Sequence, residues 1–398
     1  MKEADGLEAF GLDAALQSRR ENLLYRQRLT LDSPQGPEVM IDGRRYLAFC
    51  SNDYLGLANH PAIVASFRRA VDTYGLGGGA SHLIVGHSRP HHQLEEELAA
   101  FTRRPRALLF STGYMANLGV MSALLDSGDA VFQDRLNHAS MLDAGRLSGS
   151  RWQRYRHADL NHLEQRLRTS SARRRLIATD GVFSMDGDHA PLPGLVALAK
   201  KYRAALLVDD AHGFGTSGEG GRGSASLYNL AISDLPILMG TLGKAFGTAG
   251  AFVAGSESLV ETLIQFSRSY IYTTAMPPAI AEATRTSLRI VEREEWRREH
   301  LADLIKYFRK GCCSLGINLM SSSTAIQPVL VGAVRRVLDI SRLLAEDGIL
   351  VLPIRPPTVA RGASRLRITL CAAHKKHHVD RLLEAIDKAV CTCPEQAA

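Results

Sequence analysis

The chain has few cysteines, and their spacing fits no common framework. Its 398 residues include six, which form one adjacent pair, one C-x-C pair near the end of the sequence and two single positions: Cys50, Cys312, Cys313, Cys371, Cys391 and Cys393. This spacing matches neither a zinc site nor a disulfide framework. We therefore interpret all six as free thiols of a protein in a reducing compartment.

Long hydrophobic runs are also lacking. No uncharged apolar run approaches the roughly 20 residues of a membrane span. The first residues, MKEADGLEAFGLDA, carry acidic side chains where a secretory signal needs a basic start and an apolar centre. We expect a soluble, cytoplasmic protein that does not enter a membrane.

A nucleic-acid-binding motif is missing as well. The formal net charge of +7 suits an anionic small molecule or an acidic protein partner as well as it suits nucleic acid. Two arginine clusters, at residues 103–106 and 173–175, are not interleaved with aromatic residues. We therefore expect small-molecule substrates and no nucleic-acid partner.

Short apolar runs alternate with helical segments through the middle of the chain. The runs cover residues 107–110, 130–133, 176–178, 204–208, 237–240 and 251–254. Such alternation predicts an α/β fold with a mostly parallel sheet, which binds ligands beyond the carboxyl ends of its strands. We expect a large α/β domain over residues 46–285, after an N-terminal helical segment over residues 1–45.

The segments on either side of this large domain contain further predicted elements. Helical spacing predicts an amphipathic helix from Leu12 to Arg28, with Arg26 on a polar side, and a long connecting helix from Ala279 to Gly311. A smaller C-terminal α/β domain is expected over residues 286–398. Its predicted strands cover residues 326–331, 349–352 and 366–370, and its predicted helices cover residues 336–346 and 379–390.

One lysine stands out in the stretch PILMGTLGKAFG, residues 236–247. Lys244 follows an apolar run and lies among small residues, with Thr241 three positions before it. Most lysines lie on solvated surfaces. A lysine among apolar and glycine residues loses solvation, so the pKa of its amine falls. Such an amine is suited to Schiff-base chemistry.

Other strand ends carry what a pyridoxal 5′-phosphate site would need in addition. Asp209 ends an apolar run, where a carboxylate can keep the ring nitrogen protonated so that the ring withdraws electrons. Gly113 and Tyr114 begin a predicted helix, whose backbone N–H groups can bind a phosphate. His138 could stack on the ring, and His212 could reach its hydroxyl. Each residue alone also has a structural explanation, but together they favour a cofactor site.

The motifs around these residues resemble those of the α-oxoamine synthases, which are pyridoxal-phosphate enzymes of fold type I. The resemblance begins with D-D-A-H-G-x-G at residues 209–215 and T-x-G-K at residues 241–244. It continues through SNDYLGL, LNHAS, TDGVFSMDGD, IYTTAMPP, RPPTV and SRLRITL, and so covers nearly the whole chain. It implies a large mostly parallel sheet domain with a smaller C-terminal α/β domain, and a homodimer with its active site at the subunit interface.

The resemblance also implies a reaction. SNDYLGL, FSMDGD and RPPTV are most similar to the branch of the family that serves biotin biosynthesis. That branch is a group of acyltransferases, which condense L-alanine with a pimeloyl thioester of coenzyme A or acyl carrier protein and release carbon dioxide. One position departs from the pattern, since Asp180 stands where related synthases often have Glu.

Site residues are implied position by position. Lys244 would form the Schiff base with the cofactor and carry the substrate proton, Asp209 would pair with the ring nitrogen, and His138 and His212 would complete the catalytic set. The cofactor would also contact Gly113, Tyr114, Ser184 and Thr241, and the neighbouring subunit's phosphate would contact Thr273 and Thr274. The substrates would contact Arg26, Asn52, Thr358 and Arg367, with Arg367 binding the amino-acid carboxylate. No metal site is expected.

Three alternatives remain open at this point. The nearest is another α-oxoamine synthase, which would use glycine with acetyl-coenzyme A or serine with a long-chain acyl-coenzyme A. The second is an aminotransferase on the same fold. The third is a basic protein without enzymatic activity that binds nucleic acid.

Overall fold

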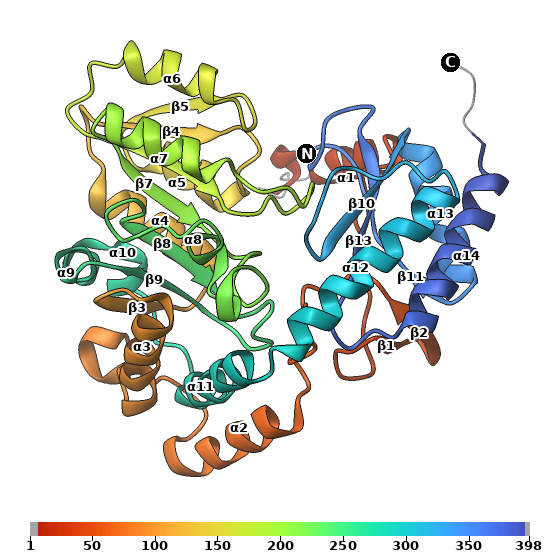
Figure 1. Ribbon diagram of the computed structural model, residues 1–398, viewed down its shortest axis with the longest axis horizontal. Coiled ribbons are helices and arrows are strands. Elements are labelled where there is room, and N and C mark those ends of the chain that lie inside the picture. Colours follow the sequence, from red (N-terminus) through yellow and green to blue (C-terminus); the bar gives the residue numbers. More distant parts are fainter. Residues whose placement is uncertain (1–6, 395–398) are drawn as a thin grey trace, which may run out of the picture.

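Two lobes make up the protein in the computed structural model, which describes residues 7–394. The larger lobe holds a broad sheet with helices on both faces, and the smaller lobe lies near both ends of the described chain (Figure 1). Within residues 7–394, no helix combines the length and the apolar composition required to span a lipid bilayer.

The sheet of the larger lobe has seven strands. In sheet order they are β3 (Arg106–Phe110), β9 (Ala251–Gly255), β8 (Ile237–Thr241), β7 (Ala205–Asp209), β6 (Arg175–Asp180), β4 (Ala130–Asp134) and β5 (Arg151–Tyr155). All neighbours run parallel except that β9 is antiparallel to both β3 and β8. The expected mostly parallel sheet is confirmed, and β6, β7 and β8 end side by side.

The apolar runs form strands because both faces of this sheet are covered. Along β7, Leu207 belongs to the apolar core on one face and Val208 to the core on the other. The same alternation holds in β6 for Leu176 and Ile177. A strand buried on both faces is apolar without a break, since successive side chains point to opposite sides.

Helices contribute to both cores. One face packs against α4 (Gly113–Leu124), α5 (Ala139–Leu147), α9 (Glu257–Phe266) and α10 (Arg268–Ile271). The other face packs against α2 (Pro61–Tyr74), α3 (Arg89–Thr102), α6 (Leu160–Arg168), α7 (Leu192–Lys201), α8 (Gly223–Leu227) and α11 (Pro278–Arg293). Short helical turns cover Glu8–Phe10, His82–Gly86 and Glu219–Gly221.

Both ends of the chain build the smaller lobe. One of its sheets has the order β1 (Glu38–Ile41), β2 (Arg44–Ala48) and β11 (Ile349–Leu350), and the other has the order β10 (Ile326–Gly332), β13 (Ser364–Thr369) and β12 (Pro353–Ile354). Its helices are α1 (Leu12–Glu21), α12 (Trp296–Ser314), α13 (Val334–Glu346) and α14 (Lys376–Thr392). The domain boundaries expected from the sequence stay predictions.

Two predicted helices were wrong in extent. The first helix ends at Glu21, because Leu23 takes a left-handed backbone conformation (φ 58°) and the Asn22 side chain binds the Ser18 carbonyl. Arg26 therefore lies beyond the helix. The predicted long helix is two helices, α11 and α12, since Glu294 leaves the helical conformation. The break leaves the Val291 carbonyl without a partner within the helix. The Arg298 guanidinium donates a hydrogen bond to it.

Candidate active site

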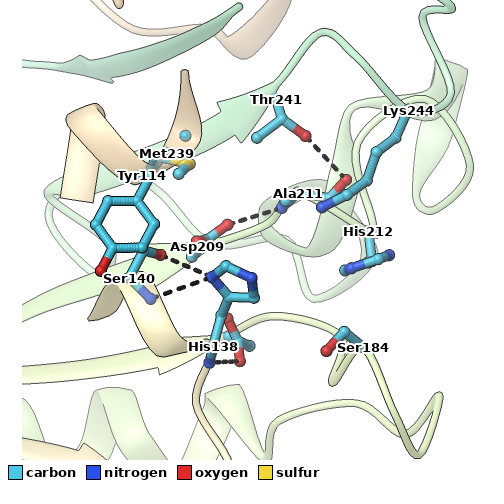
Figure 2. Close-up of a pocket in the computed structure, with 12 residues that line it drawn as sticks. Tyr114, His138, Ser140, Ser184, Asp209, Ala211, His212, Met239, Thr241 and Lys244 are labelled. Carbon is cyan, nitrogen blue, oxygen red and sulfur yellow. Dashed lines mark hydrogen bonds between the residues drawn. The ribbon is translucent and has the colours of Figure 1, made fainter. Parts of the chain in front are cut away.

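A cavity of about 170 Å³ lies where β6, β7 and β8 end. Figure 2 shows the side chains that face it. The lining residues are Gly113, Tyr114, His138, Ser140, Asp180, Ser184, Asp209, Ala211, His212, Met239, Thr241 and Lys244. The cavity therefore brings together the four residues predicted to be catalytic and four of those predicted to contact only the cofactor.

Lys244 reaches into this cavity from the loop after β8. Its side chain extends towards Ala211 (Figure 2). Burial lowers the pKa of the Lys244 amine, and the carboxylates of Asp209 and Asp180 oppose that shift. The loss of solvation expected from the flanking apolar and small residues is thus present in the structure.

Asp209 is held in one orientation at the end of β7. It is buried, and its Oδ2 accepts a hydrogen bond from Asn117 Nδ2 at 2.8 Å while its Oδ1 accepts one from the Ala211 backbone N–H at 3.1 Å. Asn117 Nδ2 also lies 2.9 Å from Ser140 Oγ. Asn117 was not among the predicted residues, although it is a single amide in the otherwise apolar stretch GYMANLGV.

His138 precedes α5 and is fixed at two points. Its ring Nδ1 lies 2.8 Å from Ser140 Oγ, and its backbone N–H donates to Asp180 Oδ2 at 2.8 Å. Burial lowers the pKa of the His138 ring, so the neutral imidazole is favoured. Burial, followed by the charge of Asp209, raises the pKa of Asp180 well above its ordinary value.

His212 joins the cavity to the predicted substrate residues. Its Nδ1 lies 2.7 Å from the Tyr54 hydroxyl, which in turn lies 3.2 Å from Asn52 Oδ1. Arg367 donates to Asn52 Oδ1 at 3.1 Å and to the Ser184 carbonyl at 2.6 Å. Burial lowers the pKa of His212 well below its usual value. Tyr54, which links these residues, was not among the predicted site residues, although the motif SNDYLGL contains it.

The start of α4 supplies a place for an anion. A Cβ atom on Gly113 would lie 2.8 Å from Thr241 Cγ2 and 3.1 Å from Met239 Cε, so only glycine fits here without a shift of its neighbours. The first amides of an α-helix have no acceptor within the helix and attract phosphate. An amine of lowered pKa, a buried oriented carboxylate and this helix start form a donor set that fits pyridoxal 5′-phosphate.

Some predicted residues lie away from the cavity. Arg26 and Thr358 meet each other at 3.3 Å beside a groove of about 980 Å³, which Tyr25, Leu352 and Arg355 also line. Thr273 and Thr274 do not line the cavity either. Thr274 forms a β-bridge with Ser81 and accepts a hydrogen bond from Ser111 Oγ at its carbonyl.

Known proteins resemble the chain along nearly all of its length. The family described as aminotransferase class I and II matches residues 44–386. The 8-amino-7-oxononanoate synthase of Stutzerimonas stutzeri (strain A1501) is 59% identical over 97% of this chain and 98% of its own. The 8-amino-7-oxononanoate synthase of Nitrosococcus oceani is 60% identical over 93% of this chain and 98% of its own.

Solved structures share the fold as well. Serine palmitoyltransferase from S. paucimobilis, solved with a bound adduct of pyridoxal phosphate and myriocin, has a TM-score of 0.92 and 30% identity over 98% of this chain and 99% of its own. The 8-amino-7-oxononanoate synthase of Francisella tularensis has a TM-score of 0.76 and 32% identity over 87% of this chain and 98% of its own. The expected fold type I architecture is therefore confirmed.

Proposed function

Because the chain belongs to the aminotransferase class I and II family, we propose that it is a pyridoxal-phosphate-dependent acyltransferase of biotin biosynthesis. It condenses L-alanine with a pimeloyl thioester and releases 8-amino-7-oxononanoate, carbon dioxide and the free thiol carrier. The observation that carries this proposal is the convergence of Lys244, Asp209 and the start of α4 on one cavity. The near full-length similarity to 8-amino-7-oxononanoate synthases supports the choice of substrates.

The cavity residues divide the work of holding the cofactor. Gly113, Tyr114 and Thr241 would bind its phosphate, and Ser184 and His212, which line the same cavity, would also contact it. Asp209, held by Asn117 and Ala211, would keep its ring nitrogen protonated. When bound, pyridoxal phosphate supplies an electron sink for the negative charge that develops on the amino-acid α-carbon.

Lys244 would move the substrate proton. Its lowered pKa favours the uncharged amine, which can accept a proton from the α-carbon of L-alanine. The same nitrogen can return that proton after the carboxylate has left as carbon dioxide. His138, whose neutral ring is held by Ser140, would lie beside the reacting atoms and assist the attack on the thioester carbonyl.

Arg367 would bind the carboxylate of L-alanine. Its guanidinium is buried, and hydrogen bonds hold it against Asn52 and against the carbonyl of Ser184, which lines the cavity. A planar guanidinium with two parallel N–H groups suits a carboxylate. The groove beside Arg26 and Thr358 combines apolar side chains with arginines, and it would take the pimeloyl chain, whether its carrier is coenzyme A or acyl carrier protein.

A homodimer would complete the site. Ile84, Val85 and Tyr272 are 73%, 81% and 72% exposed. Exposed apolar side chains that gather on one surface mark a site for another protein. These three residues flank the bridge between Ser81 and Thr274, so a second copy that covered them would also meet Thr273 and Thr274. Those two threonines would then reach the phosphate of the partner's cofactor.

A serine-using synthase is the second candidate, because serine palmitoyltransferase has a TM-score of 0.92. The two are separated by incubating the holoenzyme with pimeloyl-coenzyme A or pimeloyl acyl carrier protein and either L-alanine, glycine or L-serine. We expect mass spectrometry to find 8-amino-7-oxononanoate as the main product, with alanine preferred. Equal or faster consumption of the thioester with glycine or serine would overturn the proposal.

A further inference from the structure

A histidine of the larger lobe lies between two aspartates, and none of the three lines the cavity. His157 Nδ1 lies 3.1 Å from Asp134 Oδ1, and His157 Nε2 lies 2.9 Å from Asp188 Oδ2. Asp134 is 1% exposed at the end of β4, and the His157 ring packs edge-on against Phe183. The three polar residues come from three different segments of the larger lobe.

This arrangement requires a doubly protonated ring. Each ring nitrogen faces a carboxylate oxygen, so both must donate, as only the imidazolium can. Burial opposes the charge, but the hydrogen bonds to Asp134 and Asp188 raise the pKa of His157 to about 10. A metal site at His157, Asp186 and Asp188 is disfavoured, because both ring nitrogens are already engaged and Asp186 pairs with Arg365.

Asp188 is the last residue of a loop, residues 184–188, that meets the smaller lobe. Arg365 of β13 pairs with Asp186, and Arg367 of the same strand donates to the Ser184 carbonyl at 2.6 Å. Ser322 Oγ donates to the Gly187 carbonyl at 2.9 Å. The backbone at Gly187 is left-handed (φ +73°), and a Cβ there would lie 2.5 Å from the Ile326 carbonyl oxygen. The 184–188 loop is thus fixed from both lobes.

We infer that His157 is a positioning residue for Arg367. The imidazolium ties the 184–188 loop to the end of β4, and the loop presents the Ser184 carbonyl that orients the Arg367 guanidinium. This inference rests on the proposed function, in which Arg367 binds the amino-acid carboxylate. His157 then controls the affinity for L-alanine and leaves the acyl groove beside Arg26 unaffected.

The test uses the purified holoenzyme and three variants. His157→Ala removes both hydrogen bonds, His157→Gln keeps one amide donor, and Asp188→Asn keeps the shape but removes one charge. The KM for L-alanine should rise by about tenfold in His157→Ala and by less in the other two variants. Calorimetric titration should show the same order in the Kd for L-alanine, while the KM for pimeloyl thioester stays within about twofold.

The matched control is His377→Ala, since His377 is exposed in α14 and its ring packs edge-on against His378. It should leave the KM for L-alanine unchanged. If the wild-type enzyme makes no product from L-alanine, the proposed function fails. If it does, and the His157 and Asp188 variants lose thermal stability without any change in the KM or Kd for L-alanine, the inference fails. If His157→Ala does not fold, the KM and Kd for L-alanine of His157→Gln and Asp188→Asn test the inference instead.

Discussion

The cavity around Lys244 and the groove beside Arg26 are built in different ways. The cavity is formed by strand ends of one buried sheet, and its acid Asp209 is 4% exposed with two fixed hydrogen bonds. The groove lies between the end of α1, the coil after it, α13, β12 and the loop around Thr358. The contact from Arg26 to Thr358 at 3.3 Å is exposed. The sheet thus fixes the groups proposed to do the chemistry, while the groove proposed for the acyl chain is partly lined by exposed side chains.

The largest effect expected from this difference is at Lys244. Lys244→Ala removes both the amine that would hold the cofactor and the group that would move the substrate proton. We expect turnover to fall on the order of 10³-fold or more, since a positioned base alone contributes 10²–10⁴-fold. Circular dichroism should stay unchanged, because the side chain lines a cavity.

Lys200→Ala is the matched control, because Lys200 lies in α7 and pairs with Asp234 at an exposed position. It should keep full activity. Substantial turnover in Lys244→Ala would contradict the role proposed for Lys244 and, with it, the idea that the cavity holds the catalytic groups.

Asp209 gives the next largest effect. Asp209→Asn keeps the shape and removes the charge, and we expect kcat to fall on the order of 10²–10³-fold, as when a fixed electrostatic partner is lost. Asn117→Ala only frees the carboxylate to rotate, and its loss should be about tenfold. Steady-state kinetics at saturating cofactor measures both. Equal losses in the two variants would contradict the idea that orientation and charge contribute separately.

Much of the cavity could be predicted, because its residues follow apolar runs that the sequence shows directly. Asp209 ends such a run, and Lys244 follows another in the loop after β8. Asn117 could not be found in this way, since its partner Asp209 lies 92 positions further on. His157 was missed for the same reason, because Asp134 and Asp188 lie 23 and 31 positions away.

The missed elements have local causes. The edge strand β5 has the sequence RWQRY, in which only the last residue is buried, so it lacks the apolar run that marked the central strands. The end of α1 depends on the left-handed backbone of Leu23, which its residue type does not suggest. The strand was missed because it lies at the edge of the sheet, and the helix end because it depends on backbone geometry. A hydrophobic pattern indicates neither property.

The charge on His157, which ties the 184–188 loop to the end of β4, can be tested through the pH dependence of thermal stability. The folded-state pKa of His157, about 10, exceeds the ordinary value of 6.5, so the charged ring stabilises the folded state fully below pH 6.5. This contribution falls as pH rises and is lost above about pH 10. The difference in Tm between wild type and His157→Gln should therefore shrink steadily from pH 7 to pH 10. A difference that stays constant or grows would show that the ring is not charged in the folded protein.

The smallest effect is expected in the groove. Arg26→Ala removes an exposed guanidinium, and exposed charge contacts contribute only about 0.2–1 kcal/mol, or about 1.4- to fivefold in affinity. We expect the KM for pimeloyl thioester to rise by that factor, while kcat and the KM for L-alanine stay unchanged. Raising the salt concentration should weaken wild type towards the variant, since salt screens exposed charges. Arg28→Ala, two residues on in the same coil, is the control. A loss in Arg26→Ala as large as that in Asp209→Asn would mean that a second copy or the bound acyl chain buries Arg26, and that the groove is as firmly built as the cavity.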